Sequence, residues 1–150
     1  MTDLKGRLRT DLTAAMKARD ELRTATLRMV LSAVSAEEVA GREARTLSDD
    51  EVQAVLRREA KKRREAAEAF ASAGRADQAA REEAEGHVLA DYLPAQMEDA
   101  DLAAIVADVI TSTGASGMQD MGRVMGAAQS AVAGRAEGSR VAAEVRRQLA

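Results

Sequence analysis

Cysteine is absent from the 150-residue sequence, and aromatic residues are nearly absent. Without thiols there can be no disulfide, no thiolate nucleophile and no zinc–thiolate site. The chain also has no tryptophan, one phenylalanine and one tyrosine, which leaves almost no platform on which single-stranded bases can stack. We therefore expect an aliphatic core, and we expect any contact with RNA to be with its backbone and shape.

Long apolar runs are also missing, because no stretch of about 18 apolar residues occurs anywhere in the sequence. Residues 1–12 are charged and lack the apolar segment of a signal peptide. These features predict a cytoplasmic protein with no membrane association. The sequence has a single proline, Pro94, and 34 alanines, the residue with the highest helix propensity. The predicted fold class is therefore all-α.

Apolar residues recur at helical spacing along the whole chain and form two groups that meet at Pro94. We predict an N-terminal helical bundle in residues 1–94 and a C-terminal three-helix subdomain in residues 95–150. The expected N-terminal helices cover residues 2–16, 21–41, 48–71 and 77–93. The expected C-terminal helices begin near Leu102, Ser116 and Ser139.

Several local signals support these helix boundaries. Ser48 and Glu51 have the spacing of a capping box, and Ser116 and Gln119 predict a second one. Gly114 follows an amphipathic segment, so we expect it in the left-handed conformation that ends many helices.

Four glycines and three methionines lie between Thr113 and Ala128. The phosphate-binding patterns GxGxxG and GxxxxGK[ST] are both absent, and no strand precedes the segment. Gly122 and Gly126 are four residues apart, so they share one helix face, where they predict close packing against the two neighbouring helices. The methionines would then fill the irregular gaps. The alternative is a surface on which a partner docks.

Residues that carry chemistry are few. The only histidine, His87, precedes an apolar segment, and we expect it to be a packed or half-exposed side chain. Carboxylates mostly lie four residues from a cation, as in Glu59 with Arg63, which is typical of ion pairs on a solvated helix face. No metal-ligand spacing occurs. We therefore predict no catalytic residue, no metal and no cofactor.

Two basic segments are candidates for nucleic-acid binding. Residues 57–65 are rich in lysine and arginine, but the cations at 61–64 point around the helix and alternate with glutamates, so a solvated helix face is the preferred interpretation. Residues 97–121 hold five acidic residues and no cation, whereas residues 122–150 hold five arginines. Arginines close to a helix N-terminus suit phosphate groups. The predicted RNA-binding residues are Arg123, Arg135, Arg140, Arg146 and Arg147.

The order of these motifs resembles that of the GatB/YqeY family. The resemblance rests on five segments across nearly the whole chain: LRMVLSAV (27–34), KKRREAAEAFASAGRAD (61–77), LADYLPAQM (89–97), TGASGMQDMGRVMGAA (113–128) and GRAEGSRVAAEV (134–145). It implies an all-α protein similar to the C-terminal tail of the B subunit of the tRNA-dependent amidotransferase, which helps to hold tRNA.

The family label that the resemblance implies is a carbon–nitrogen ligase with glutamine as amido-N-donor. The domains that phosphorylate and cradle the substrate in that enzyme are missing here, so the resemblance does not imply its reaction for this chain. We expect a non-catalytic accessory module that binds tRNA or another structured RNA. The alternative is a helical protein–protein adaptor without RNA binding, with the Met118, Met121 and Met125 edge or the acidic 97–121 face as its contact surface.

Overall fold

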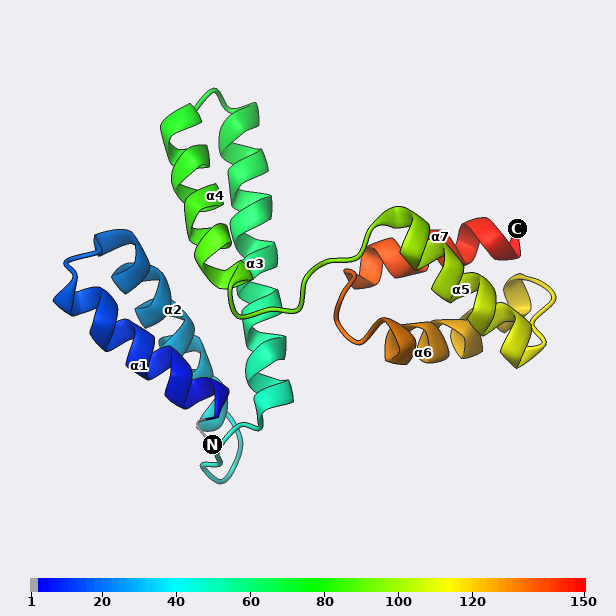
Figure 1. Cartoon of the computed structure of the whole chain (residues 1–150), viewed down its shortest axis with the longest axis horizontal. Helices are drawn as coiled ribbons and strands as arrows, with labels where there is room; N and C mark the ends of the chain where they lie inside the picture. The colour runs from blue at the N-terminus through cyan, green and yellow to red at the C-terminus, as the bar shows by residue number, and fades with distance from the viewer. Residues whose placement is uncertain (1–2) are drawn as a thin grey trace. The chain divides into compact units, whose positions relative to one another are not determined.

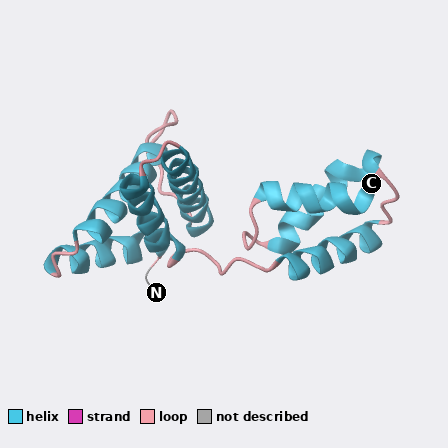
Figure 2. Cartoon of the chain, turned by 90° about the horizontal axis from the view of Figure 1, so that it is seen from above, coloured by secondary structure: helices cyan, strands magenta, loops and turns pink. Residues whose placement is uncertain are grey.

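The computed structural model describes residues 3–150, and all regular secondary structure in this part of the chain is helical (Figures 1 and 2). The predicted all-α fold is therefore confirmed. Seven α-helices and one short 3₁₀ helix occur among the described residues. They are α1 (Leu4–Lys17), α2 (Glu21–Glu38), α3 (Asp49–Ser72), α4 (Ala76–Ala90), α5 (Asp99–Thr113), η1 (Met118–Asp120), α6 (Met121–Val132) and α7 (Gly138–Leu149).

The chain divides into two compact units, one ending at Leu93 and the other beginning at Pro94. We call them the N-terminal unit and the C-terminal unit. Each has a separate hydrophobic core. None of the helices in the described residues is long and apolar enough to cross a membrane.

The N-terminal unit consists of two helical hairpins, α1–α2 and α3–α4 (Figure 1). Each of the four helices contributes one leucine to the centre of the core: Leu8, Leu27, Leu56 and Leu89 are completely buried. Burying a leucine side chain stabilises a fold by roughly 1.5–3 kcal/mol relative to leaving it exposed. These four side chains therefore hold the two hairpins together.

At the starts of α1, α2 and α3, side chains accept hydrogen bonds from free backbone amides. Asp3 caps α1 and Asp20 caps α2. The predicted capping box of Ser48 and Glu51 is confirmed at the start of α3, with both of its reciprocal hydrogen bonds present. The left-handed conformation predicted for Gly114 at the end of α5 is also confirmed, with φ of 67°. The start of α3 and the end of α5 could thus be predicted from the sequence, because both depend on local hydrogen bonds.

The pair of Glu59 and Arg63 does form, but not on a solvated face as predicted. Glu59 is only 6% exposed, and its carboxylate lies 3.4 Å from the guanidinium of Arg63. Arg63 also pairs with two carboxylates of α4, Glu82 at 3.5 Å and Glu85 at 3.4 Å. This largely buried network forms because Arg63 lies on the side of α3 that packs against α4. We call these four residues the Arg63 cluster.

Other expectations for the N-terminal unit need correction. Helix α2 ends at Glu38, three residues before Gly41, and α4 ends at Ala90 before Leu93. His87 is exposed, because Val88 and Leu89 occupy the core-facing positions of α4. Met16 continues the four-residue spacing of Leu4, Leu8 and Leu12 along α1, but it is 42% exposed.

The C-terminal unit is a three-helix bundle of α5, α6 and α7 with a core of smaller side chains. Val106, Val124, Val132 and Val141 are at most 1% exposed. Val141, Val145 and Leu149 recur every four residues along α7 and are all buried. With 57 residues and a valine-rich core, this unit buries less apolar area than the N-terminal unit, and we expect it to be the less stable of the two.

The predicted capping box of Ser116 and Gln119 is wrong. The amide of Ser116 donates to Asp120 Oδ2 at 2.9 Å, and the side chain of Gln119 reaches Ser116 Oγ at 3.4 Å. A 3₁₀ turn at Met118–Asp120 comes first, and α6 begins only at Met121, without a side-chain cap. The carboxylate of Asp120, four residues after Ser116, accepts from the amide of Ser116 and so takes the role that the sequence pattern assigned to Gln119.

Close helix packing at Gly122 and Gly126 is also wrong. Both glycines are exposed, and a Cβ atom added to either would meet nothing within 4 Å. The core face of α6 is instead formed by Val124, Ala128 and Val132. The glycines lie on the other side of the helix because they are two residues out of step with this stripe. Their lost helix propensity, about 0.8–1.0 kcal/mol each, is not recovered by contacts within the chain.

Candidate nucleic-acid interface

The five predicted RNA-binding arginines belong to the α6–α7 part of the C-terminal unit, where the two helices form an antiparallel hairpin (Figure 1). Arg135 and Arg140 lie at the end where the two helices are joined, whereas the other three lie at the opposite end, near the start of α6 and the end of α7. The arginines therefore form two groups on the bundle.

At the opposite end, two of the arginines are paired within their own helices. Arg123 donates to Asp120 Oδ1 at 3.0 Å, and Arg147 donates through Nε to Glu144 Oε2 at 3.0 Å. The hydrogen bond from Arg147, followed by one from Gln148, lowers the pKa of Glu144 to about 2. The side chain of Arg146 is exposed and makes no hydrogen bond or ion pair. Only one of these three cations is thus free of a carboxylate.

At the connecting end, hydrogen bonds attach the α6–α7 turn to the segment before α5. The amide of Met97 donates to the carbonyl of Arg135 at 2.8 Å. Arg140 donates to the carbonyl of Met97 at 3.0 Å and to Asp99 Oδ1 at 2.8 Å. These bonds fix the position of the first turn of α7. The side chain of Arg140 is 32% exposed and that of Asp99 is 96% exposed, so this ion pair lies at the surface of the unit.

The turn itself has an unusual backbone. Ala133 and Gly134 both adopt positive φ angles, 52° and 77°. This reverses the chain sharply and leaves the side chain of Arg135 exposed, with no hydrogen bond or ion pair. Left-handed residues of this kind are common at helix C-termini, where glycine is favoured. Arg135 is therefore available to a ligand that approaches the turn.

Helix α7 begins without a side-chain cap. Its first intrahelical hydrogen bond runs from the amide of Val141 to the carbonyl of Glu137 at 3.0 Å. The amides of Gly138, Ser139 and Arg140 precede it and have no partner within the helix. Together with Arg135, they form a set of donors at the positive end of a helix, which is an arrangement that suits phosphate. We call residues 134–140 the α7 entry.

A polar cluster in the N-terminal unit was not foreseen from the sequence. Tyr92, the only tyrosine, is 4% exposed. Its hydroxyl donates to Asp11 Oδ2 at 2.6 Å and accepts from Arg23 at 3.0 Å. The guanidinium of Arg7 lies 4.7 Å from the centre of its ring. Burial, and then the bond to Asp11, raises the pKa of Tyr92 to about 12. No local pattern could have shown these contacts, because Tyr92 lies 81 residues from Asp11 in sequence.

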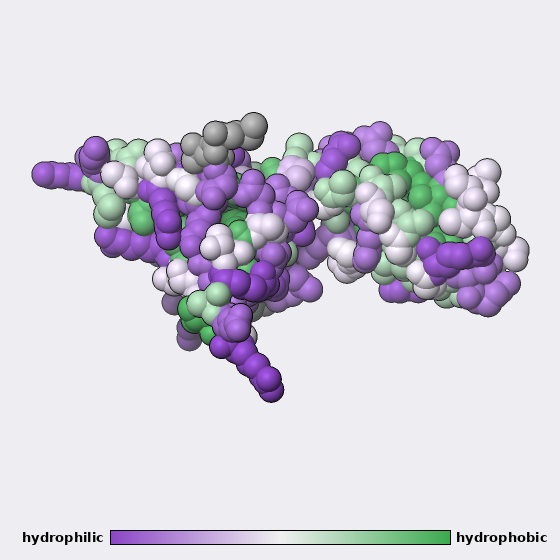
Figure 3. Space-filling view, turned by 90° about the horizontal axis from the view of Figure 1, so that it is seen from below, coloured by the Kyte–Doolittle hydropathy of each residue, from purple (hydrophilic) through white to green (hydrophobic). Residues whose placement is uncertain are grey.

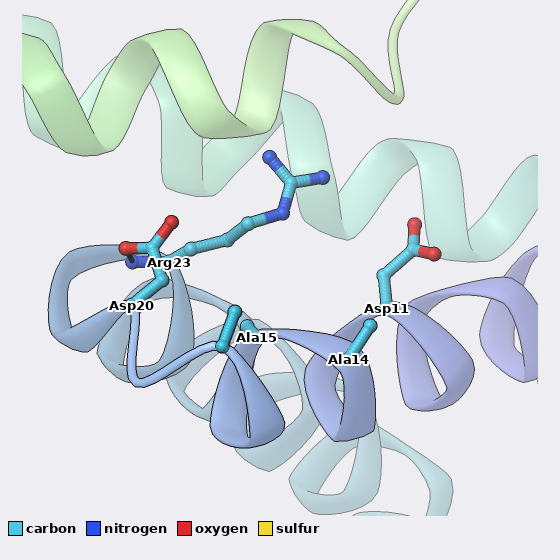
Figure 4. A pocket seen from close by; sticks show the side chains of 6 residues that line it. Asp11, Ala14, Ala15, Asp20 and Arg23 are labelled. Atoms are coloured by element: carbon cyan, nitrogen blue, oxygen red, sulfur yellow. Dashed lines mark hydrogen bonds between the residues drawn. The ribbon is translucent and has the colours of Figure 1, made fainter.

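An open depression of about 210 Å³ adjoins this cluster. Figure 4 shows Arg23 and Asp11 extending to the same side of the α1–α2 hairpin, above Ala14 and Ala15. Asp20, which also lines it, already accepts a hydrogen bond from the amide of Arg23. The charges of this site are thus largely satisfied within the chain, and its role is to join α1 and α2 to the end of α4. Among the described residues, no group of His, Cys, Asp and Glu is arranged to hold a metal ion.

The fold and these surfaces define an all-helical protein of two units, in which the charged groups of the N-terminal unit partly stabilise its interior and those of the C-terminal unit lie outside. The chain belongs to the family described as Yqey-like protein, whose model matches residues 5–149. No curated protein matches the sequence.

Proposed function

We propose that this protein is a non-catalytic module that binds structured RNA, such as tRNA, and that the α7 entry contacts the phosphate backbone. One observation carries the proposal. Arg135 is unpaired and exposed beside the uncapped amides that begin α7, so both a full charge and directed donors face solvent at one place. Arg140 adds a second guanidinium, already oriented by Met97.

The near absence of aromatic side chains agrees with this mode of binding. Phe70 is half-buried and Tyr92 is buried, so no aromatic ring of the described chain is fully exposed for base stacking. Recognition would then depend on shape and phosphate spacing, as is common for double-stranded RNA. The resemblance to the amidotransferase tail does not extend its glutamine-dependent reaction to this chain, and in this proposal the chain only holds the RNA.

The test compares two charge reversals in full-length protein. Arg135→Glu changes the α7 entry, and Arg123→Glu makes the same change in charge at the opposite end of the bundle. We expect Arg135→Glu to weaken tRNA binding at least tenfold and Arg123→Glu to change it less than threefold, measured by fluorescence anisotropy at ~100 mM salt. Equal losses would mean a general charge effect, and unchanged binding by Arg135→Glu would refute the site.

A second candidate function is supported by the outer face of α6. Gly122 and Gly126 are exposed there, and Met118, just before the helix, is 47% exposed. A protein adaptor would use this smooth face for close contact with a partner helix. Replacing both glycines with leucine leaves the fold unstrained but blocks such contact. A partner captured by the wild-type protein and lost by this variant, with RNA binding unchanged, would favour the adaptor over the RNA module.

A further inference from the structure

The exposed side of α3 carries a row of cations that the C-terminal arginines do not explain. Arg57, Lys61 and Arg64 are all exposed. They follow the i, i+4, i+7 spacing that places residues on one helix face. At 1.5 Å per residue, the row extends about 10 Å along the helix axis. We call these three residues the α3 row.

Glu59 and Arg63 lie within this segment of the sequence, but they are not part of the exposed face that carries the row. Glu59 and Arg63 point toward α4 and are largely buried, with their side chains 8% and 19% exposed. The sequence alternates in charge between residues 57 and 65, but the surface does not, because burial removes the only acidic residue between residues 52 and 64. The preferred sequence interpretation, a solvated face of mixed charge, missed this separation.

The cations beside the row are paired with carboxylates. Arg58 and Lys62 lie beside it and pair with Glu37 and Glu59. Lys61 is 3.9 Å from Glu65, a distance at which an exposed pair contributes little. Arg57 has no hydrogen bond or ion pair in the described structure. Acidic residues limit the patch at both ends, at 49–51 and again from Glu65 onward.

The chemistry of the face favours a polyanion over a protein partner. The cores of protein interfaces are enriched in aromatic residues, methionine and arginine and are otherwise depleted of charged residues. The large hydrophobic residues exposed in the described chain are Met16, Val39 and Met118, and none of them lies on α3. Successive cations of the row are about 6 Å and about 4.5 Å apart along the helix axis. A phosphate backbone that follows the helix can therefore contact all three of them.

We propose that the α3 row is a second RNA-binding surface, through which the N-terminal unit contacts the phosphate backbone of a structured RNA. The choice of RNA as the polyanion rests on the proposed function, but the surface does not depend on the α7 entry. An RNA that contacts both surfaces would be held by two units joined through Pro94, so that each unit adds to the affinity of the other.

The test uses neutral substitutions in full-length protein. The row variant is Arg57→Gln, Lys61→Gln and Arg64→Gln. Its matched control is Arg9→Gln, Lys17→Gln and Arg75→Gln, which removes three exposed cations scattered over the same unit. Circular dichroism melts show that both variants are folded before binding of bulk tRNA is measured between ~50 and ~200 mM salt.

We expect the row variant to bind tRNA at least tenfold more weakly and to lose about two to three units from the slope of log affinity against log salt, because about three phosphate contacts are gone. The control should lose less than one unit. Equal losses in the row variant and the control, or an unchanged row variant, would overturn the α3 row.

The same titration with Arg135→Glu separates the two proposals. If the row variant weakens binding and Arg135→Glu does not, the α3 row stands and the α7 entry fails. If only Arg135→Glu weakens binding, the α7 entry stands and the α3 row fails. If wild-type protein does not bind tRNA, both proposals are wrong, and binding of an acidic protein by the row would be the remaining explanation of its charge.

Discussion

The two units handle charge in opposite ways. The N-terminal unit buries an arginine among three carboxylates and a tyrosine between two arginines and an aspartate. The C-terminal unit has an aliphatic core and keeps its five arginines at the surface or, like Arg140, partly exposed. Buried charges must be satisfied by partners, so they set the packing of the helices. Exposed charges, which also cover much of the N-terminal unit (Figure 3), contribute little to stability, and those without a carboxylate partner are available to bind a ligand.

The largest loss of stability is expected when Arg63 is removed. Arg63→Ala leaves Glu59, Glu82 and Glu85 without their shared cation, and we expect the N-terminal unit to lose about 3–5 kcal/mol of unfolding free energy. Arg58→Ala removes an exposed cation one turn away, whose pair with Glu37 is worth about 0–1 kcal/mol. Urea unfolding followed by circular dichroism measures both. Equal losses would show that the Arg63 cluster is not a structural element.

The next largest loss of unfolding free energy is expected when a core side chain is shortened. Leu56→Ala should cost the N-terminal unit about 2–5 kcal/mol, and Val124→Ala should cost the C-terminal unit less because fewer buried methyl groups are removed. Since the two cores are separate, each variant should lower the stability of its own unit only. Hydrogen exchange of backbone amides can follow each unit separately. A joint loss of protection in both units would contradict independent cores.

A smaller effect of the opposite sign is expected on α6. Gly122→Ala and Gly126→Ala should each stabilise the C-terminal unit by about 0.8–1.0 kcal/mol, because the added Cβ meets nothing within 4 Å. Gly114→Ala is the control, and it should destabilise because of its φ of 67°. Thermal melts measure all three. Destabilisation by the α6 substitutions would restore the interpretation of tight packing.

The last prediction concerns the titration of Tyr92, which leaves stability at neutral pH unchanged. Its pKa of about 12 lies above the ordinary value of 10.0, so its contribution to stability is fully present below pH 10 and is lost as the pH rises toward 12. Because it is the only tyrosine, the ultraviolet absorbance of tyrosinate reports it directly. The midpoint should be near 12 in folded protein and near 10 in urea, and Asp11→Asn should lower the folded value. A folded midpoint near 10 would contradict the buried cluster.

Most features set by neighbours in the sequence could be predicted, although the capping box at Ser116 could not, and features set by distant residues could not. The capping box at Ser48 and the left-handed Gly114 depend on residues within four positions. The spacing of Gly122 and Gly126 was also read correctly, but spacing does not say which face is the core. The parallel stripe of Val124, Ala128 and Val132 carried that information, because buried faces are aliphatic.

The candidate interface follows the same division. The sequence shows which cations are present and that Arg135 lies shortly before the start of a helix. The pairing of Arg140 with Met97 and Asp99 spans more than 40 residues and has no local signature. The α3 row was visible only in part, because the burial of Glu59 follows from how α3 packs against α4.

The most direct test of RNA binding by this protein is a titration of isotope-labelled full-length protein with tRNA, followed by backbone amide chemical shifts in NMR. We expect the largest changes in chemical shift at Gly138, Ser139 and Arg140, together with changes along residues 57–64 of α3. Shifts confined to the outer face of α6, or the absence of shifts at a tRNA concentration equal to that of the protein, would contradict this expectation.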